Sequence, residues 1–137
     1  MLLLVCASAA SAQAETIQLG MSVPLTGNAS GLGQSYKNGV ELAINQLNKE
    51  GGVQGAKVQL LVKDDQYEPE LTVLNTRQFI IENNVLALFA YVGTPTSAAI
   101  LPLLKHYQTP YITPFTGASL LRQPEHSFIY HLRAGYD

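Results

Sequence analysis

Residues 85–97, VLALFAYVGTPTS, place an apolar run directly before a loop of hydroxyl-bearing and small side chains. Residues 110–119, PYITPFTGAS, repeat this order with a shorter apolar run. Each run predicts a buried strand, and in an open α/β sheet ligands bind beyond the carboxyl ends of the strands. Neither loop contains Cys, His, Asp, Glu or Lys. The two loops therefore predict a site that binds a small polar molecule without transferring a proton.

Outward from these loops, strand and helix patterns alternate along the chain. Strands are predicted at residues 16–23, 57–62, 85–92, 110–113 and 128–132. Helices are predicted at residues 34–50, 68–82 and 97–107, and Pro102 is expected to kink or break the third. Short connections between alternating elements predict an α/β fold, a doubly wound and mostly parallel sheet with helices on both faces.

The spacing of side chains predicts how these helices face the sheet. The first helix carries an apolar stripe at helical spacing, made of Tyr36, Val40, Ala43, Ile44 and Leu47. The expected inner face of the second helix consists of Leu71, Leu74, Gln78 and Ile81. Thr94 or Thr96 is expected to be the N-cap of the third helix.

The overall composition limits the class of protein. The 137 residues suffice for one domain, and an apolar fraction of 47% allows a packed core. The net charge is −2 and no basic run occurs, so the chain lacks the electrostatic signature of binding to nucleic acid or anionic lipid.

The first fourteen residues, MLLLVCASAASAQA, differ in kind from the rest. They are apolar, then small, and end in an A-x-A pattern, which predicts a signal peptide with a clipped start, cleaved near Ala14. The alternative is a disordered apolar N-terminus of a cytosolic protein. Cys6, the single cysteine, lies within this segment, where a lipid anchor is a further alternative. The segment is too short for a membrane span, which needs about 20 apolar residues.

Three other motifs argue against catalysis. Gly31-Leu32-Gly33 resembles part of a dinucleotide fingerprint, but Tyr36 stands where the third glycine belongs. The adjacent Asp64 and Asp65 are expected to point to opposite sides of a strand end, so they do not form an acid/base pair. The three histidines lack metal-ligand spacing, and no Gly-x-Ser-x-Gly motif occurs. Neither a metal nor a cofactor is expected.

The hydroxyl-rich loops remain the candidate site. Their threonines could serve only to cap a helix or end a strand, but a helix N-terminus also offers free N–H groups to a carboxylate. The hypothesis is that Thr94, Thr96 and Ser97 hold a ligand carboxylate. The second loop would add backbone contacts and an apolar wall through Phe115, Thr116 and Gly117. Leu32 and Gly33 are candidates for a further loop of the cleft.

Several short motifs together identify a family. They are PLTG at 24–27, GGVQG at 51–55, DDQYEP at 64–69, GTPTS at 93–97, PFTGA at 114–118 and LRA at 132–134. In this order and spacing, over residues 17–137, the chain resembles the periplasmic substrate-binding proteins of ABC transporters for branched-chain amino acids, the leucine/isoleucine/valine type.

The resemblance implies two α/β lobes joined by a hinge, a ligand bound between them and a closed form that docks on the membrane permease. Residues 15–137 would be the N-terminal lobe, without the second lobe that carries the side-chain pocket. By position, the family's carboxylate-binding hydroxyl falls on Thr94, and contacts of the second loop fall on Phe115 and Gly117. An aromatic contact of some members falls on Leu32.

The expected function is that of an extracytoplasmic, monomeric solute-binding component of an ABC importer, located in the periplasm. It would bind an amino acid, an amide or a small aromatic acid, and it would not be an enzyme. The alternatives are a ligand-sensing domain of a receptor or regulator with the same fold, an oxidoreductase with a nucleotide-binding first domain, and a truncated fragment that binds nothing.

Overall fold

A computed structural model describes residues 15–136 of the chain. The predicted signal peptide, the cleavage site near Ala14 and the candidate lipid anchor at Cys6 lie outside these residues. Within them, no helix combines the length and the apolar character that a membrane crossing requires.

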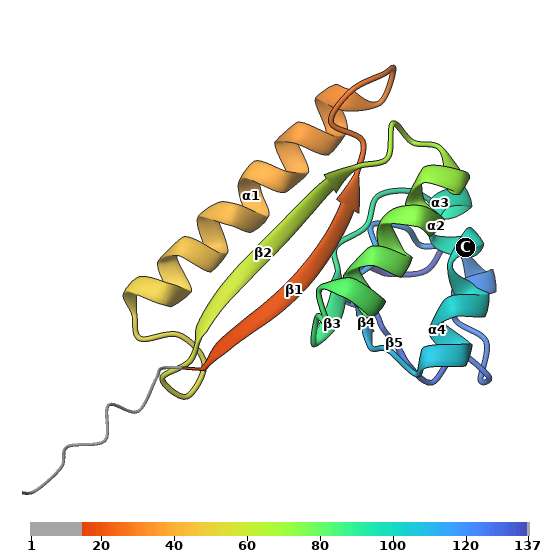
Figure 1. Ribbon diagram of the computed structural model, residues 1–137. Coiled ribbons are helices and arrows are strands. Elements are labelled where there is room, and N and C mark those ends of the chain that lie inside the picture. The colour runs from red at the N-terminus through yellow and green to blue at the C-terminus, as the bar shows by residue number, and fades with distance from the viewer. Residues whose placement is uncertain (1–14, 137) are drawn as a thin grey trace, which may run out of the picture.

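A five-stranded parallel sheet forms the centre of the molecule (Figure 1). The strands are β1 (Thr16–Val23), β2 (Lys57–Asp64), β3 (Ala87–Phe89), β4 (Tyr111–Ile112) and β5 (Ile129–Tyr130), and their order in the sheet is β2-β1-β3-β4-β5. Because β1 pairs with β2 on one side and β3 on the other, the winding direction reverses there. The predicted doubly wound α/β fold is confirmed, and such a switch point is where open sheets bind ligands.

Helices cover both faces of the sheet, as predicted (Figure 1). The long helix α1 packs on β2 and β1, whereas α2 packs on β1 from the opposite face beside α3. The bounds are α1 (Ser30–Lys49), α2 (Pro69–Arg77) with a π-helical continuation η1 (Gln78–Glu82), α3 (Thr94–Ala99), α4 (Leu101–Tyr107) and a 3₁₀ turn η2 (Ser119–Leu121). The predicted break near Pro102 is confirmed, because α3 and α4 are separate helices that meet at Ile100.

The core has two parts, one on each face. The larger cluster lies under α2, α3 and α4 and is built around Phe79, Leu88, Tyr91, Ile100 and Tyr111. The smaller cluster lies on the side of α1 and contains Met21, Val23, Ala90 and Val92. Tyr36 and Val40 of the predicted stripe pack against it, whereas Ala43 is exposed, contrary to the prediction.

The expected inner face of the second helix is wrong. Leu74 and Ile81 are 59% and 54% exposed, and the buried side chains are those of Thr72, Thr76 and Phe79. The threonines turn inward because their hydroxyls have buried partners. The hydroxyl of Thr72 lies 3.3 Å from a carboxylate oxygen of Asp65, and that of Thr76 lies 3.0 Å from the phenol oxygen of Tyr91.

Strands β3, β4 and β5 are shorter than the apolar runs that predicted them. After β3 the backbone of Ala90 turns to a φ of 57°, and after β4 that of Thr113 turns to 50°. These are left-handed conformations that interrupt a strand. The chain therefore leaves the sheet just before each hydroxyl-rich loop.

Candidate functional site

The two hydroxyl-rich loops meet at the carboxyl ends of β3 and β4. The hydroxyl oxygens of Thr94 and Thr116 lie 2.7 Å apart, although 22 positions separate them in the chain. The N–H of Phe115 donates to the carbonyl of Tyr91 at 2.8 Å, which holds the second loop against the first. The tertiary structure thus brings together the two loops for which the sequence predicts a binding site.

Left-handed backbone conformations also occur at this edge. Positive φ angles occur at Gln66 and Tyr67 after β2, at Ala90 and Gly93 after β3, and at Thr113 after β4. Residues in sparsely populated conformations cluster at binding and catalytic sites, where the surrounding structure holds them in place. Gln54, Asn84 and Gln108, which precede β2, β3 and β4 at the opposite end of the sheet, also have positive φ, so backbone conformation alone does not distinguish this edge.

Thr96 and Ser97 face away from this edge. Both are fully buried. The Thr96 hydroxyl donates to the carbonyl of Val92 at 2.6 Å, and the Ser97 hydroxyl lies 2.7 Å from the phenol oxygen of Tyr111. Their side chains secure α3 to the core, which leaves Thr94, on the accessible side, as the hydroxyl of this loop that can reach a ligand.

The expected N-cap of this helix is also wrong. Gly93 precedes the first helical residue, and neither Thr94 nor Thr96 makes a side-chain capping hydrogen bond. Gly93 has a φ of 103°, and a β-carbon there would come within 2.5 Å of the Tyr67 ring. A glycine is required at this position because Tyr67 lies on the backbone at the entrance to α3.

Phe115 and Gly117 are surrounded by aromatic and basic groups. The Phe115 ring lies 4.6 Å from that of Tyr36 and 4.7 Å from the guanidinium carbon of Arg133. The N–H of Tyr136 donates to the Gly117 carbonyl at 2.7 Å. Hydrogen bonds to its phenol oxygen from the backbone of Gly117 and the hydroxyl of Thr116 lower the pKa of Tyr136. The phenol oxygen of Tyr136 therefore lies where a backbone N–H and a hydroxyl of the second loop both donate.

Leu32 and Gly33 behave differently from one another. Leu32 is 48% exposed, so it is free to line a cleft. Gly33 is buried, and the carbonyl of Pro24 occupies the space in which a β-carbon would stand. Its backbone is approached by the chain itself, so Gly33 is removed from the candidate ligand contacts.

Sequence reasoning did not single out Tyr36, Tyr67, Arg133 or Tyr136 as site residues. The helical pattern places Tyr36 in the apolar stripe of α1, and the residue does pack on the core. Arg133 could have been found by applying the strand-end rule to the last strand, since it follows β5 closely. Nothing in the sequence places it on the Phe115 ring, because that contact depends on how two loops fold together.

Asp64 and Asp65 diverge, as expected. Asp65 is fully buried, and one of its carboxylate oxygens accepts a hydrogen bond from Ser22 at 2.8 Å. Asp64 caps the turn that follows β1, accepting hydrogen bonds from the N–H of Leu25 at 2.7 Å and from the N–H and hydroxyl of Thr26. Both carboxylates are occupied by the protein itself. In residues 15–136 no group of three metal-ligating side chains comes together.

The two carboxyls are shifted in opposite directions. Burial raises the pKa of Asp65 more than its hydrogen bonds from Ser22, Tyr67 and Thr72 lower it. Desolvation also acts on Asp64, but hydrogen bonds from Thr26, Gln66 and Leu25 together lower its pKa below 3.8. A carboxyl with a lowered folded-state pKa stabilises the fold above its unfolded pKa, and this stabilisation is lost as the pH falls through the folded pKa.

Asp64→Asn is therefore expected to destabilise the protein near pH 7, and the difference should shrink as the pH falls below the usual Asp pKa of about 3.9 toward the lower pKa of the folded protein. Urea unfolding of both proteins between pH 3 and pH 7, a range set by the usual Asp pKa of about 3.9, measures the difference. A difference in unfolding free energy that does not change over this range would contradict the assigned role of Asp64.

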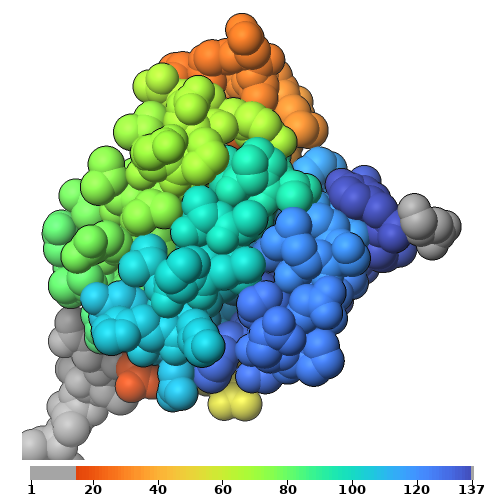
Figure 2. All heavy atoms as spheres, turned by 90° about the vertical axis from the view of Figure 1, so that its right-hand side faces the viewer, coloured from red at the N-terminus to blue at the C-terminus, as the bar shows by residue number. Residues whose placement is uncertain are grey.

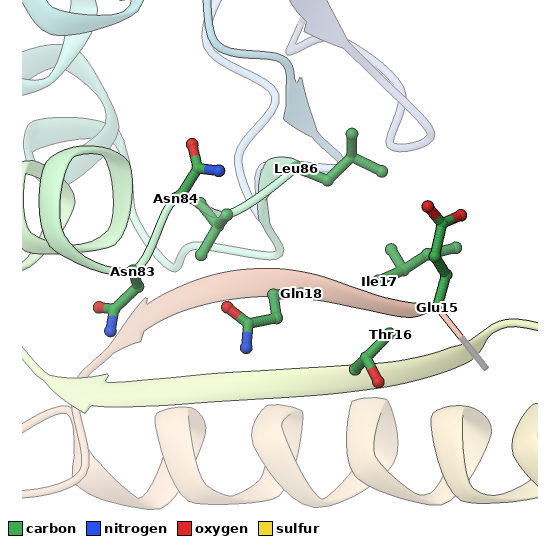
Figure 3. Close-up of a pocket in the computed structure, with 8 residues that line it drawn as sticks. Glu15, Thr16, Ile17, Gln18, Asn83, Asn84 and Leu86 are labelled. Atoms are coloured by element: carbon green, nitrogen blue, oxygen red, sulfur yellow. The ribbon is translucent and has the colours of Figure 1, made fainter. Parts of the chain in front are cut away.

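A larger cavity lies at the other end of the sheet. It has a volume of about 630 Å³ and is bordered by residues 15–18 and 83–86, at the amino ends of β1 and β3 (Figure 3). It is open and contains no hydroxyl pair, whereas a polar pocket of about 290 Å³ at the carboxyl ends of β1 and β2 is bordered by Gly27 and Tyr67. Cavity size alone therefore does not mark the candidate site, which rests on the hydroxyls that meet at the carboxyl ends of the strands.

The comparisons agree with this geometry. A family model described as "Periplasmic binding protein" matches residues 16–137. The Leu/Ile/Val-binding protein homolog 3 of Brucella melitensis is 32% identical over 105 residues, which are 77% of this chain and 28% of that protein.

Solved structures give the same result. A possible leucine/isoleucine/valine-binding protein from Rhodopirellula baltica superposes with a TM-score of 0.85 at 34% identity, covering 93% of this chain and 34% of that one. A fatty acid ABC transporter substrate-binding protein from Thermomonospora curvata has a TM-score of 0.78 at 28% identity, covering 89% and 30%. The chain spans about a third of these proteins and belongs to the periplasmic binding protein family.

Proposed function

We propose that this chain forms the N-terminal lobe of a solute-binding component of an ABC importer, and that it binds an amino acid or a related small carboxylate. The observation that carries the proposal is the Thr94–Thr116 hydroxyl pair, 2.7 Å apart at the switch-point edge of the sheet. It stands beside the Gly117 backbone, in loops that contain no acid, base or thiol.

The number of hydroxyl hydrogens in the Thr94–Thr116 pair supports binding of a ligand through an oxygen acceptor. The two hydroxyls share one hydrogen bond, whichever of them donates, so the pair has one further O–H; the Tyr136 phenol accepts it here, and a ligand oxygen would take the place of that phenol. Thr116 also accepts a hydrogen bond from the N–H of Ala118 at 3.2 Å, which fixes the orientation of its oxygen. The arrangement supplies directed donors to a carboxylate and has no group that could serve as a general base.

The remainder of the proposal follows from the family. A second lobe would close over this edge by a hinge and would supply the contacts that select the ligand side chain. The closed form would dock as a monomer on a membrane permease, and the leader at residues 1–14 would direct the protein to the periplasm. The names of the relatives refer to leucine, isoleucine and valine or to a fatty acid as ligands, and all of these compounds carry a carboxylate.

The experiment is a thermal-shift screen of the full-length gene product against amino acids and small carboxylic acids, followed by calorimetry. Thr94→Ala is expected to weaken the best ligand by about 1–3 kcal/mol, because it leaves a buried polar partner without its hydrogen bond. Thr16→Ala, at the opposite end of β1, is the matched control and should bind as the wild type does. Equal affinity in the Thr94 variant would contradict the placement of the carboxylate.

A further inference from the structure

The segment that follows β5 folds back over the candidate site. The N–H of Tyr136 donates to the Gly117 carbonyl, and a β-carbon on Gly117 would come within 2.7 Å of the Ala134 carbonyl oxygen. Figure 2 shows this last described segment, in dark blue, on the surface next to the lighter blue residues that follow β4. Arg133, which begins the segment, is thereby held beside the loop that contains Phe115, Thr116 and Gly117.

Aromatic rings hold the Arg133 side chain. Its guanidinium carbon lies 4.7 Å from the Phe115 ring centroid and 6.0 Å from that of Tyr136. Stacking on a ring occupies the face of a guanidinium and leaves its N–H donors, which lie in the plane, free to bind. Less side-chain entropy is then lost when a ligand forms hydrogen bonds to it.

The charge of Arg133 is not neutralised within residues 15–136. The ion pair in this part of the chain joins Lys37 and Glu41, and the Arg133 guanidinium makes neither an ion pair nor a hydrogen bond there. Asp64 and Asp65, the carboxylates at the neighbouring strand ends, are occupied by Thr26 and Ser22. Arg122 adds a second positive charge, since its guanidinium donates to the Arg133 carbonyl at 2.5 Å.

We propose that Arg133 is a ligand-binding residue, whose guanidinium pairs with a carboxylate of the solute and makes the site selective for acids over the corresponding amides. The proposal rests on the proposed function, because it assumes that a small carboxylate binds at this edge. A planar, pre-oriented guanidinium matches the two oxygens of a carboxylate, and such charge-assisted bidentate contacts are among the strongest hydrogen bonds in proteins. A neutral amide offers this group one acceptor and no charge.

The test compares acids with their amides on the full-length gene product by calorimetry. The pairs are L-leucine and L-leucinamide, 4-methylpentanoate and its amide, and benzoate and benzamide. The variants are Arg133→Gln, Arg133→Lys and the control Arg77→Gln, which removes an exposed arginine from the last turn of α2. Melting temperatures without ligand verify that each variant is folded.

We expect the wild type and Arg77→Gln to prefer an acid over its amide. Arg133→Gln should weaken the acid by roughly tenfold or more, the usual result of removing one partner of a charge pair. Arg133→Lys should recover part of this loss, since it keeps the charge and loses the planar fork. Unchanged acid binding by Arg133→Gln would overturn the inference alone, whereas a wild type that binds none of the acids would overturn the proposed function with it.

Discussion

Replacing Gly33 with alanine is expected to destabilise the protein by about 3 kcal/mol, at the upper end of the usual penalty for overpacking. Gly33 lies in the first turn of α1, and a β-carbon there would collide with the carbonyl oxygen of Pro24, with the carbonyl carbon only 2.7 Å away. The obstacle is backbone, so rotation of a side chain cannot relieve it. Either the loop that precedes α1 or the helix itself must move.

Gly39 in the same helix supplies the control. No atom lies within 4 Å of the place where its β-carbon would stand. Gly39→Ala is therefore expected to stabilise the protein by about 0.5–1 kcal/mol, through the better helix propensity of alanine. Urea unfolding of both variants measures the contrast. Two variants of equal stability would show that the 24–29 loop is not held against α1 in solution.

Asp65→Ala is expected to have a comparable effect, a loss of about 2–4 kcal/mol, because buried donors would be left without an acceptor. The carboxylate of Asp65 accepts hydrogen bonds from the hydroxyl of Ser22 at 2.8 Å and from the N–H of Tyr67 at 3.0 Å. Thr72 keeps a second acceptor, the carbonyl of Glu68, so its hydroxyl is not left unpaired.

Two variants test the role of Asp65. Asp65→Asn retains one acceptor oxygen and should lose less stability than Asp65→Ala. Glu70→Ala removes an exposed carboxylate from the first turn of α2 and should change stability by a few tenths of a kcal/mol. Unfolding free energies from urea titration rank the three proteins. If Asp65→Ala were no less stable than Glu70→Ala, the buried network would contribute nothing to the fold.

Asp65 also matters for the candidate site. Its contact with the N–H of Tyr67 supports the left-handed turn at Gln66 and Tyr67, and the ring of Tyr67 lies on Gly93 at the entrance to α3. A chain of contacts therefore runs from the buried carboxylate to the loop of Thr94. Loss of Asp65 is expected to disturb that loop as well as the core.

Much of the architecture could be predicted from the sequence because it depends on local pattern. An eight-residue strand such as β1, a glycine pair after α1 and an apolar run before each hydroxyl-rich loop are visible without knowledge of any distant partner. The alternation of strands with helices then determines parallel pairing, since parallel strands need crossovers. Parallel pairing in turn places the loops of residues 93–97 and 113–119 at one edge of the sheet.

The orientation of individual side chains depended on the tertiary structure. Thr72 and Thr76 turn inward because their hydroxyls form hydrogen bonds with the buried Asp65 and Tyr91. Ser97 turns inward because its hydroxyl forms one with Tyr111. Hydrophobic periodicity treats a hydroxyl as an outward residue and cannot anticipate a buried partner.

By itself, the sequence determined the fold class and the order of the elements, and it predicted the edge of the sheet at which we propose that a solute binds. Only the tertiary structure decided which hydroxyls of that edge are accessible, and it alone placed Arg133 on the ring of Phe115. The reason is physical: periodicity reports burial averaged over a layer, whereas a binding site is made of contacts between loops that are far apart in the chain.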